Sequence, residues 1–100
     1  MLEDYRGGRV RLTVERVQHI VEHREMAGME AEIEETLHDP ELVIQSSSDE
    51  GTKLCYRLYA GTLFGDKWLC VVLKYTDDPF VLTAYLTDKP KKGKELWRKR

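Results

Sequence analysis

The fold is decided by the stretch Phe80-Val81-Leu82-Thr83-Ala84-Tyr85-Leu86-Thr87, which runs directly into Asp88-Lys89-Pro90-Lys91-Lys92-Gly93-Lys94. Apolar side chains alternate with mostly hydroxyl-bearing ones in the first part, which predicts a β-strand with one face toward a core. A strand that carries hydroxyls and then ends in lysines presents hydrogen-bond donors and positive charge together, which suits a phosphate-bearing ligand. Nucleic acid is therefore the first partner that the sequence indicates.

Three more segments with a two-residue period precede this strand, at residues 41–46, 53–60 and 67–75. Short segments rich in Ser, Gly, Asp and Thr separate the four, at residues 46–51, 61–66 and 76–79. Such segments are typical of tight turns between neighbouring antiparallel strands. The second half of the chain therefore predicts a four-stranded antiparallel meander.

The first half of the chain has helical periodicity instead. Thr13 is the expected N-cap of a helix from about Val14 to Arg24, whose apolar stripe is Val14, Val17, Ile20 and Val21. A second helix is expected up to Pro40, with Met26, Met29, Ile33 and Leu37 as its apolar positions. Gly28 either marks the bend between the two helices or weakens a single long one. The predicted fold is α+β, with two N-terminal helices packed on one face of a four-stranded antiparallel β-sheet.

Length and composition predict one domain that covers residues 1–100, with residues 1–12 as an N-terminal extension and residues 89–100 as a basic C-terminal tract. The N-terminus is too polar for a signal peptide, and the longest apolar run, Trp68 to Leu73, is too short to cross a bilayer. We therefore expect a cytoplasmic protein without membrane contact. Cys55 and Cys70 are expected to be reduced packing residues.

Charge is divided unevenly along the chain. Residues 89–100 contain seven Lys or Arg and one Glu, a net charge of +6. Because the whole chain has a formal net charge of −2, residues 1–88 carry −8. Many of these acidic groups lie in the second predicted helix and just after it, whereas the C-terminal tract could follow a phosphate backbone. A solvated acidic face and a frayed basic end are the simpler alternatives.

The positions of the turns predict which residues share a face of the sheet. If Gly65-Asp66 and Asp77-Asp78 centre the last two hairpins, Arg57 lies opposite Lys74, and Val72 lies opposite Thr83. One face then displays Leu54, Tyr56, Leu58, Leu69, Val71, Leu73, Phe80, Leu82, Ala84 and Leu86, and it is expected to carry the helices. The other face displays Cys55, Arg57, Tyr59, Trp68, Cys70, Val72, Lys74, Val81, Thr83, Tyr85 and Thr87. Such a half-apolar face with cations suits a polyanion whose bases stack on aromatic rings.

Two histidines are candidates for acid–base chemistry. His19 and His23 lie four residues apart, hence on one side of the first predicted helix. Histidine titrates near neutral pH, so either residue could serve as general acid or base in cleavage of a phosphodiester. The alternatives are a metal site with Glu15 or Glu22, for which the fuller His-Glu-x-x-His pattern is missing, or no chemical role. We predict no metal and no cofactor.

Cations within apolar strands are the second group of candidates. Because burying an unpaired charge is costly, Arg57 and Lys74 must be paired with an opposite charge, exposed to solvent, or part of a functional site. Beside Thr83 and Tyr85, they could hold a phosphate and stabilise the extra negative charge of a pentacoordinate transition state. Two solvent-facing charges on an open sheet are the alternative. Predicted RNA-binding residues outside this group are Tyr59, Lys89, Lys91, Lys92 and Lys94.

Several motifs in this order resemble the phage-associated branch of the barnase, EndoU, colicin and RelE nuclease superfamily. They are His19-Ile20, His23-Arg24-Glu25-Met26, Leu37-His38-Asp39-Pro40, Tyr56-Arg57, Val71-Val72-Leu73-Lys74 and the strand from Phe80 to Thr87. The resemblance spans residues 13–97. One departure is Arg24, where the family pattern often has proline after the second histidine.

The resemblance implies a small, toxin-like ribonuclease with N-terminal helices on a four-stranded antiparallel sheet. It implies metal-independent cleavage, in which the ribose 2′-hydroxyl attacks its own phosphate. His19 or His23 would be acid or base, Arg57 and Lys74 would contact the phosphate, and Thr83 and Tyr85 would donate hydrogen bonds. The implied partners are RNA and an antitoxin or immunity protein.

Two other functions remain open at this stage. The protein could be a non-catalytic RNA- or protein-binding module that keeps the nuclease fold. It could also be an interaction protein whose acidic second helix docks a basic partner. Cleavage of RNA would indicate the nuclease, RNA binding without cleavage the binding module, and a stable protein partner the interaction protein.

Overall fold

The structure is a computed structural model that describes residues 1–100. Helix α1 spans Val14–Val21, and it begins at the predicted cap, because Thr13 Oγ1 accepts a hydrogen bond of 3.1 Å from the N–H of Arg16. A 3-10 turn, η1 (Arg24–Met26), follows, and α2 spans Glu30–His38. Gly28 has a φ of 75°, a left-handed conformation that suits glycine, so the bend lies where the sequence placed it.

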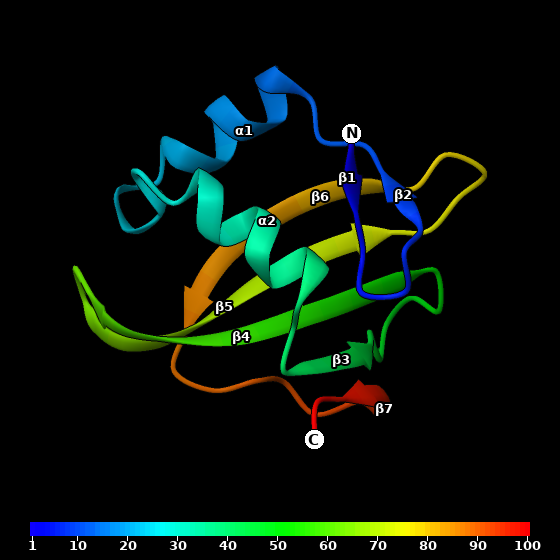
Figure 1. The fold of residues 1–100 in the computed structure, drawn as a ribbon. Coiled ribbons are helices and arrows are strands. Elements are labelled where there is room, and N and C mark those ends of the chain that lie inside the picture. The colour runs from blue at the N-terminus through cyan, green and yellow to red at the C-terminus, as the bar shows by residue number, and fades with distance from the viewer.

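Five strands form the main antiparallel sheet, in the order β6-β5-β4-β3-β7 (Figure 1). Their bounds are Leu42–Gln45 for β3, Thr52–Thr62 for β4, Gly65–Lys74 for β5, Phe80–Thr87 for β6 and Lys94–Arg98 for β7. A separate two-stranded sheet pairs β1 (Leu2–Glu3) with β2 (Arg9–Val10). The prediction of a single four-stranded sheet is therefore wrong, although the α+β class and the four predicted strands are present.

Within the main sheet, the strand that the sequence did not indicate is β7. It pairs antiparallel with β3, with Val43 opposite Trp97 and Ile44 opposite Glu95. Its two apolar residues, Leu96 and Trp97, are consecutive, so the segment has no two-residue period. Part of the predicted basic C-terminal tract is thus an edge strand of the sheet, opposite to the edge formed by β6.

The N-terminal residues pack against the sheet. Val10 is fully buried among core residues from the helices and the main sheet. Asp4 is also buried, and one of its carboxylate oxygens accepts hydrogen bonds from the N–H groups of Arg6 and Gly8. The other oxygen accepts a hydrogen bond of 2.5 Å from the hydroxyl of Tyr75. The segment predicted as an N-terminal extension is a small hairpin tied to the main sheet.

The predicted strand register is right for most of one hairpin and wrong for the other. Val72 lies opposite Thr83, as expected, but a bulge after this pair places Leu73 opposite Val81, so Val81 lies in the core beneath the helices and not on the face predicted for RNA. Arg57 lies opposite Leu69 rather than Lys74, which itself pairs with Thr52. The β4–β5 turn closes between Thr62 and Gly65, because Thr62 Oγ1 accepts the N–H of Phe64 and donates to the carbonyl of Gly65. A bulge between Tyr59 and Thr62 shifts the pairing by one more residue. The total difference from the predicted pairing is therefore odd, and the two faces of β4 are exchanged.

Two clusters of buried residues lie on opposite faces of the sheet. The helix-side core joins the helices and η1 to the sheet and comprises Val10, Ile20, Met26, Ile33, Leu37, Val43, Cys55, Leu69, Val71, Leu73, Val81 and Ala84. The far-side core comprises Leu42, Ile44, Leu54, Tyr56, Cys70 and Val72. Leu54 and Tyr56 were predicted beneath the helices, and the exchange of faces in β4 moves them to the far side.

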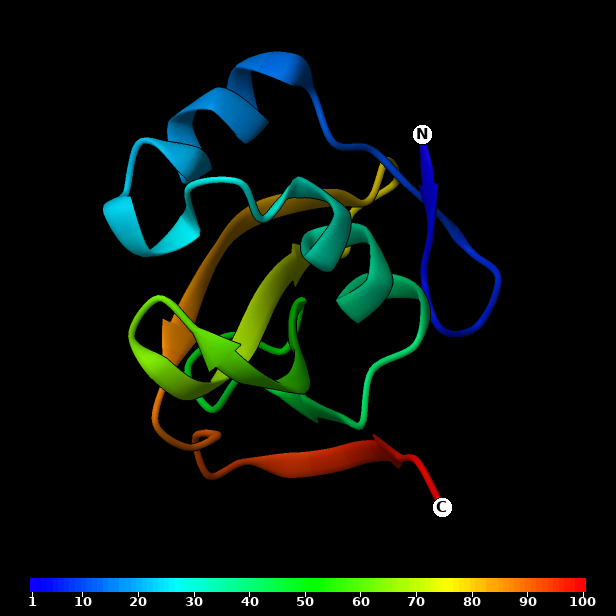
Figure 2. The ribbon, with the colours of Figure 1, turned by 60° about the vertical axis from the view of Figure 1, so that its left-hand side comes forward.

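The chain itself crosses the far face of the sheet. After β6 it passes beneath the sheet, on the side away from the helices, and then forms β7 beside β3 (Figures 1 and 2). The N–H of Lys91 donates a hydrogen bond of 3.1 Å to the hydroxyl of Tyr56 in the far-side core. The open sheet face that the sequence predicted for RNA is therefore covered in part by residues 88–93.

Candidate functional site

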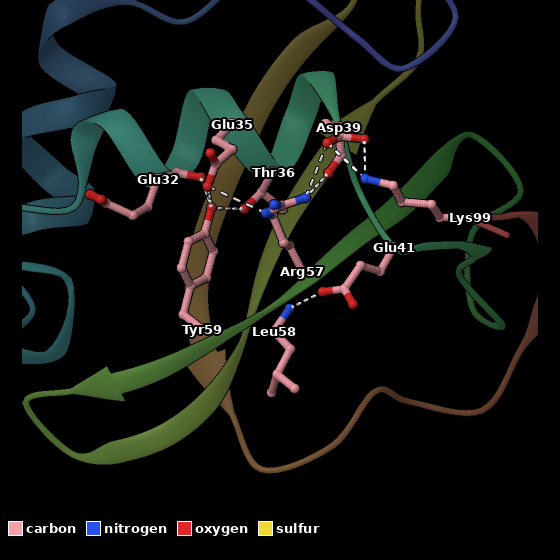
Figure 3. Close-up of polar contacts among 9 residues, drawn as sticks. All are labelled: Glu32, Glu35, Thr36, Asp39, Glu41, Arg57, Leu58, Tyr59 and Lys99. Carbon is pink, nitrogen blue, oxygen red and sulfur yellow. Dashed lines mark hydrogen bonds and ion pairs between the residues drawn. The ribbon is translucent and has the colours of Figure 1, made fainter.

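Arg57 lies at the centre of a polar cluster between β4 and α2 (Figure 3). Its Nε lies 3.3 Å from Glu35 Oε1, and its Nη1 lies 2.7 Å from the carbonyl oxygen of Asp39 and 3.3 Å from Asp39 Oδ2. The hydroxyl of Tyr59 donates a hydrogen bond of 2.5 Å to the same Glu35 oxygen. Lys99, just after β7, lies 2.9 Å from Asp39 Oδ2. We call Glu35, Asp39, Arg57, Tyr59 and Lys99 the arginine cluster.

The side chains of the arginine cluster are partly exposed, and their charges and hydrogen bonds shift one another's pKa values. The side chain of Arg57 is 24% exposed, whereas those of Glu35 and Asp39 are 51% and 45% exposed. The hydrogen bond from Lys99 lowers the pKa of Asp39, and the charge of Arg57 adds to this effect. Burial, followed by the hydrogen bond to Glu35, raises the pKa of Tyr59 to about 12. At neutral pH the phenol is therefore a proton donor beside a carboxylate.

Arg57 lies on the face of the sheet opposite to the one that the sequence predicted. The exchange of faces in β4 turns Arg57 and Tyr59 toward the helices, away from Thr83 and Tyr85. Tyr85 lies opposite Cys70 and packs on the far-side core. The sheet therefore separates Arg57 and Tyr59 from the two β6 residues with which they were predicted to form a site.

The two histidines lie on the outside of the helical layer. Both side chains are exposed, and their ring centroids are 6.4 Å apart. The ion pair of His19 is with Glu22, at 3.9 Å, and no hydrogen bond or ion pair links either imidazole to Arg57, Lys74 or Tyr85. The structure therefore does not bring the histidines together with the other predicted catalytic residues.

Lys74 is held at the end of β5 by a loop between β3 and β4. Its ammonium forms an ion pair with Asp49 and lies 3.5 Å from Thr52 Oγ1. Asp49 also accepts hydrogen bonds from the N–H of Gly51 and the hydroxyl of Thr52. The bond from Lys74 is the largest of the effects that lower the pKa of Asp49 to about 2. Lys74 thus stabilises a turn, and its charge is already paired.

Residues 88–94, which comprise the connection after β6 and the first residue of β7 and which we call the lysine loop, form a strongly cationic exposed segment. Lys89, Lys91, Lys92 and Lys94 are all exposed, and none of them forms an ion pair with a carboxylate. The loop backbone is held at both ends. Thr87 donates to the carbonyl of Lys89, and Gly93 lies so close to the sheet that a Cβ there would be 2.7 Å from the carbonyl of Gln45.

Aromatic side chains lie under the lysine loop. The Lys91 ammonium is 6.0 Å from the ring centroid of Tyr85, within the range of a cation–π contact. Tyr85 and Trp68 are both half-buried and pack on the far-side core. Burial raises the pKa of Tyr85, and it raises the pKa of Cys70 to about 11 and that of Tyr56 to about 12. These groups therefore remain neutral at physiological pH, and Tyr85, which is half-buried, can stack or donate a hydrogen bond.

Metal-ligating side chains do not gather anywhere in the structure in groups of three or more. Neither α1 nor α2 has the length and apolar character that crossing a membrane requires.

Comparison with known proteins gave no match to a family model, to a curated protein or to a solved structure. The resemblance to the nuclease superfamily therefore stays a prediction.

Sequence reasoning missed the carboxylates of the arginine cluster. Glu35 lies on α2 and Asp39 is the residue directly after it, so their four-residue spacing within a predicted helix was an available signal. It was hidden because α2 carries other glutamates as well, at positions 30, 32 and 34. Only the register of β4 distinguishes the pair that meets Arg57 from the acidic residues that face solvent.

Proposed function

We propose that the protein binds single-stranded RNA through the lysine loop. The observation that carries the proposal is that Lys89, Lys91, Lys92 and Lys94 are exposed on a backbone held against the sheet, without carboxylate partners. When unpaired lysines neutralise phosphates, the counterions condensed on the nucleic acid are released. This release is the main source of sequence-independent affinity for nucleic acid. A held backbone lowers the ordering cost of binding.

The distribution of charge supports one orientation of the RNA. The acidic residues of α2 lie in the helical layer, on the other side of the sheet from the lysine loop (Figure 2). A polyanion is therefore attracted more strongly to the far side than to the acidic face of α2. The pI of about 5.9 for the whole chain does not argue against this surface, because recognition depends on the local field.

Half-buried aromatic rings supply the second element of a single-strand site. Tyr85 lies next to Lys91, and Trp68 lies opposite Thr87, where β6 enters the lysine loop. A base that stacks on an aromatic ring gains about 1 to 3 kcal/mol. We expect little preference for sequence, because stacking and phosphate contacts do not read base edges.

A binding assay with a matched control tests this proposal. Fluorescence anisotropy with a labelled single-stranded RNA compares wild type with the triple variant Lys91→Gln, Lys92→Gln and Lys94→Gln. The control is Arg6→Gln, Arg9→Gln and Lys53→Gln, which removes the same charge near the N-terminal hairpin. We expect the first variant to lose roughly tenfold or more in affinity and the control to lose much less. Equal losses would contradict a site at the lysine loop.

Metal-independent cleavage of RNA is the second candidate function, and the geometry of the arginine cluster favours it. Glu35 Oε1 is shared by the guanidinium of Arg57, at 3.3 Å, and the hydroxyl of Tyr59, at 2.5 Å. A half-exposed carboxylate can take the proton of a ribose 2′-hydroxyl, and the neighbouring guanidinium can stabilise the charge that develops on phosphorus oxygens. Tyr59, whose hydroxyl lies 2.5 Å from Glu35 Oε1, would give its proton to the leaving 5′-oxygen and regain one from Glu35. This candidate assigns the role of base to Glu35 and not to a histidine.

Cleavage is tested with labelled RNA in the presence of a chelator. The expected product ends in a 2′,3′-cyclic phosphate, and it is lost in Glu35→Gln and Arg57→Ala but kept in His19→Ala. Loss of the product in His19→Ala or His23→Ala alone would favour the histidine assignment instead. Wild type that binds RNA without forming product is a binding module only. Circular dichroism checks that each variant is folded.

A further inference from the structure

Helix α1 leaves part of its apolar stripe uncovered. Val14, Val17, Ile20 and Val21 recur at the spacing of a core-facing stripe, yet Ile20 is the one α1 residue that is buried. Val14 is 73% exposed, whereas Val17 and Val21 are half-buried. A stripe of this kind normally faces another element of the fold. No other element of this chain covers the N-terminal part of the stripe, at Val14.

A groove lies beside the uncovered part of the stripe. Its apolar lining comes from three parts of the chain: Val14 and Val17 of α1, Leu2 and Leu12 of the N-terminal segment, and Ile33 of α2, with Gln18 beside them. Its volume is about 310 Å³, so it is large enough for a few bulky apolar side chains. Leu2 and Leu12 are themselves half-buried and pack on the helix-side core. The groove is therefore formed by parts of the chain that the core holds in place.

Two acidic residues form the rim of the groove. Glu30 and Glu34 are one helical turn apart on α2, both are exposed, and neither forms an ion pair. Like charges at this spacing repel each other, so the two glutamates lower the stability of α2 unless a cation lies between them. The apolar groove and its rim are thus complementary to a segment that is both apolar and basic.

We propose that this groove docks a segment of a partner protein that carries two or three bulky apolar side chains flanked by Lys or Arg. The acidic rim disfavours RNA and anionic lipid surfaces, because both are negatively charged. A second copy of the chain is a poor occupant. Its own apolar pair between cations, Leu96 and Trp97, is half-buried and packs on the helix-side core. The surface lies in the helical layer, so it is separate from the lysine loop.

A peptide titration tests the proposal. The probe is a fluorescein-labelled amphipathic helical peptide of Leu and Lys, and the protein is the full chain. Val14→Asp places a charge in the groove without touching the core, because Val14 is largely exposed. We expect one saturable site whose affinity falls about tenfold or more in Val14→Asp and in the double variant Glu30→Gln and Glu34→Gln. The control double variant Glu3→Gln and Glu50→Gln removes the same charge elsewhere and is expected to bind as wild type does.

Several results would overturn the proposal. These are failure of the wild type to bind the peptide, equal binding by Val14→Asp, and equal binding of a Leu and Glu peptide. Dimerisation in sedimentation that Val14→Asp abolishes would assign the groove to a second copy. Binding of anionic vesicles that Val14→Asp abolishes would assign it to a lipid surface. Retained RNA binding by Val14→Asp is expected in every case, so this test is independent of the lysine loop.

Discussion

The backbone N–H of Lys91 donates a hydrogen bond of 3.1 Å to the hydroxyl of Tyr56, a residue that is fully buried on β4. This bond joins the crossover between β6 and β7 to the centre of the sheet. It therefore fixes the backbone of the lysine loop on the far face, and it links the packing of the far-side core to the surface that we propose for RNA.

Tyr56→Phe removes this bond and leaves the ring in place. We expect a loss of about 1 kcal/mol in the free energy of unfolding, the usual net value of one hydrogen bond, together with faster hydrogen exchange at the Lys91 amide. Tyr5→Phe is the control, because the Tyr5 hydroxyl makes no hydrogen bond in the structure and its ring packs on Trp97. Unchanged exchange at Lys91 would show that the bond does not hold the loop.

Gly93→Ala tests the close approach of the crossover to β3. The added Cβ would lie 2.7 Å from the carbonyl oxygen of Gln45, so the backbone must move. We expect a loss of about 1 to 3 kcal/mol, as for other overpacked sites, measured by urea unfolding. Gly51→Ala is the matched control, since its Cβ would meet no atom closer than 3.4 Å. Similar stability of the two variants would contradict the position of β7.

Arg57→Lys tests whether the arginine cluster holds α2 on β4. A lysine keeps the charge but cannot contact Glu35 and the carbonyl of Asp39 with a planar fork. Because the side chains are partly exposed, we expect a loss of only about 1 to 2 kcal/mol in the free energy of unfolding. A double-mutant cycle with Glu35→Gln measures the coupling between the two residues. A coupling energy near zero would mean that the cluster adds nothing to stability.

The Asp49 carboxylate predicts a pH dependence of stability. Its pKa is lowered to about 2, first by the hydrogen bond from Lys74, so folding favours the charged form. The contribution is present above the unfolded pKa of about 4 and is lost as the pH falls through the folded pKa. The difference in unfolding free energy between wild type and Asp49→Asn is therefore expected to be constant from neutral to mildly acidic pH and to shrink toward the folded pKa. A difference that stays the same as the pH falls from the unfolded pKa toward the folded pKa would contradict the ion pair.

Local signals predicted the elements better than they predicted their pairing. The Thr13 cap, the bend at Gly28 and the end of α2 before Pro40 follow from chemistry within a few residues, and the structure contains all three. The register of β5 with β6 was right from Trp68 to Val72, but a bulge beside the turn pairs Leu73 with Val81 and not with Leu82. The register of β4 failed because the turn lies at Leu63-Phe64 and not at Gly65-Asp66, and because a bulge between Tyr59 and Thr62 shifts the pairing by one further residue.

The candidate site depended on that single register, so its residues were predicted less well than the fold. Arg57 and Tyr59 were identified, but they were assigned to the face that carries Tyr85. Their partners on α2 could not be chosen without knowing which face of β4 the helix covers. The lysine loop was predicted directly, because its lysines are consecutive enough in sequence to be neighbours in any fold.

The salt dependence of RNA affinity tests the central proposal most directly. Observed binding constants of wild type and of the Lys91→Gln, Lys92→Gln and Lys94→Gln variant are measured over a series of salt concentrations. Each lysine that neutralises a phosphate of a single strand contributes about 0.7 to the slope of the logarithmic plot. We predict that the variant has a slope smaller in magnitude by roughly 2. Equal slopes for the two proteins, or no binding by wild type at low salt, would contradict RNA binding by the lysine loop.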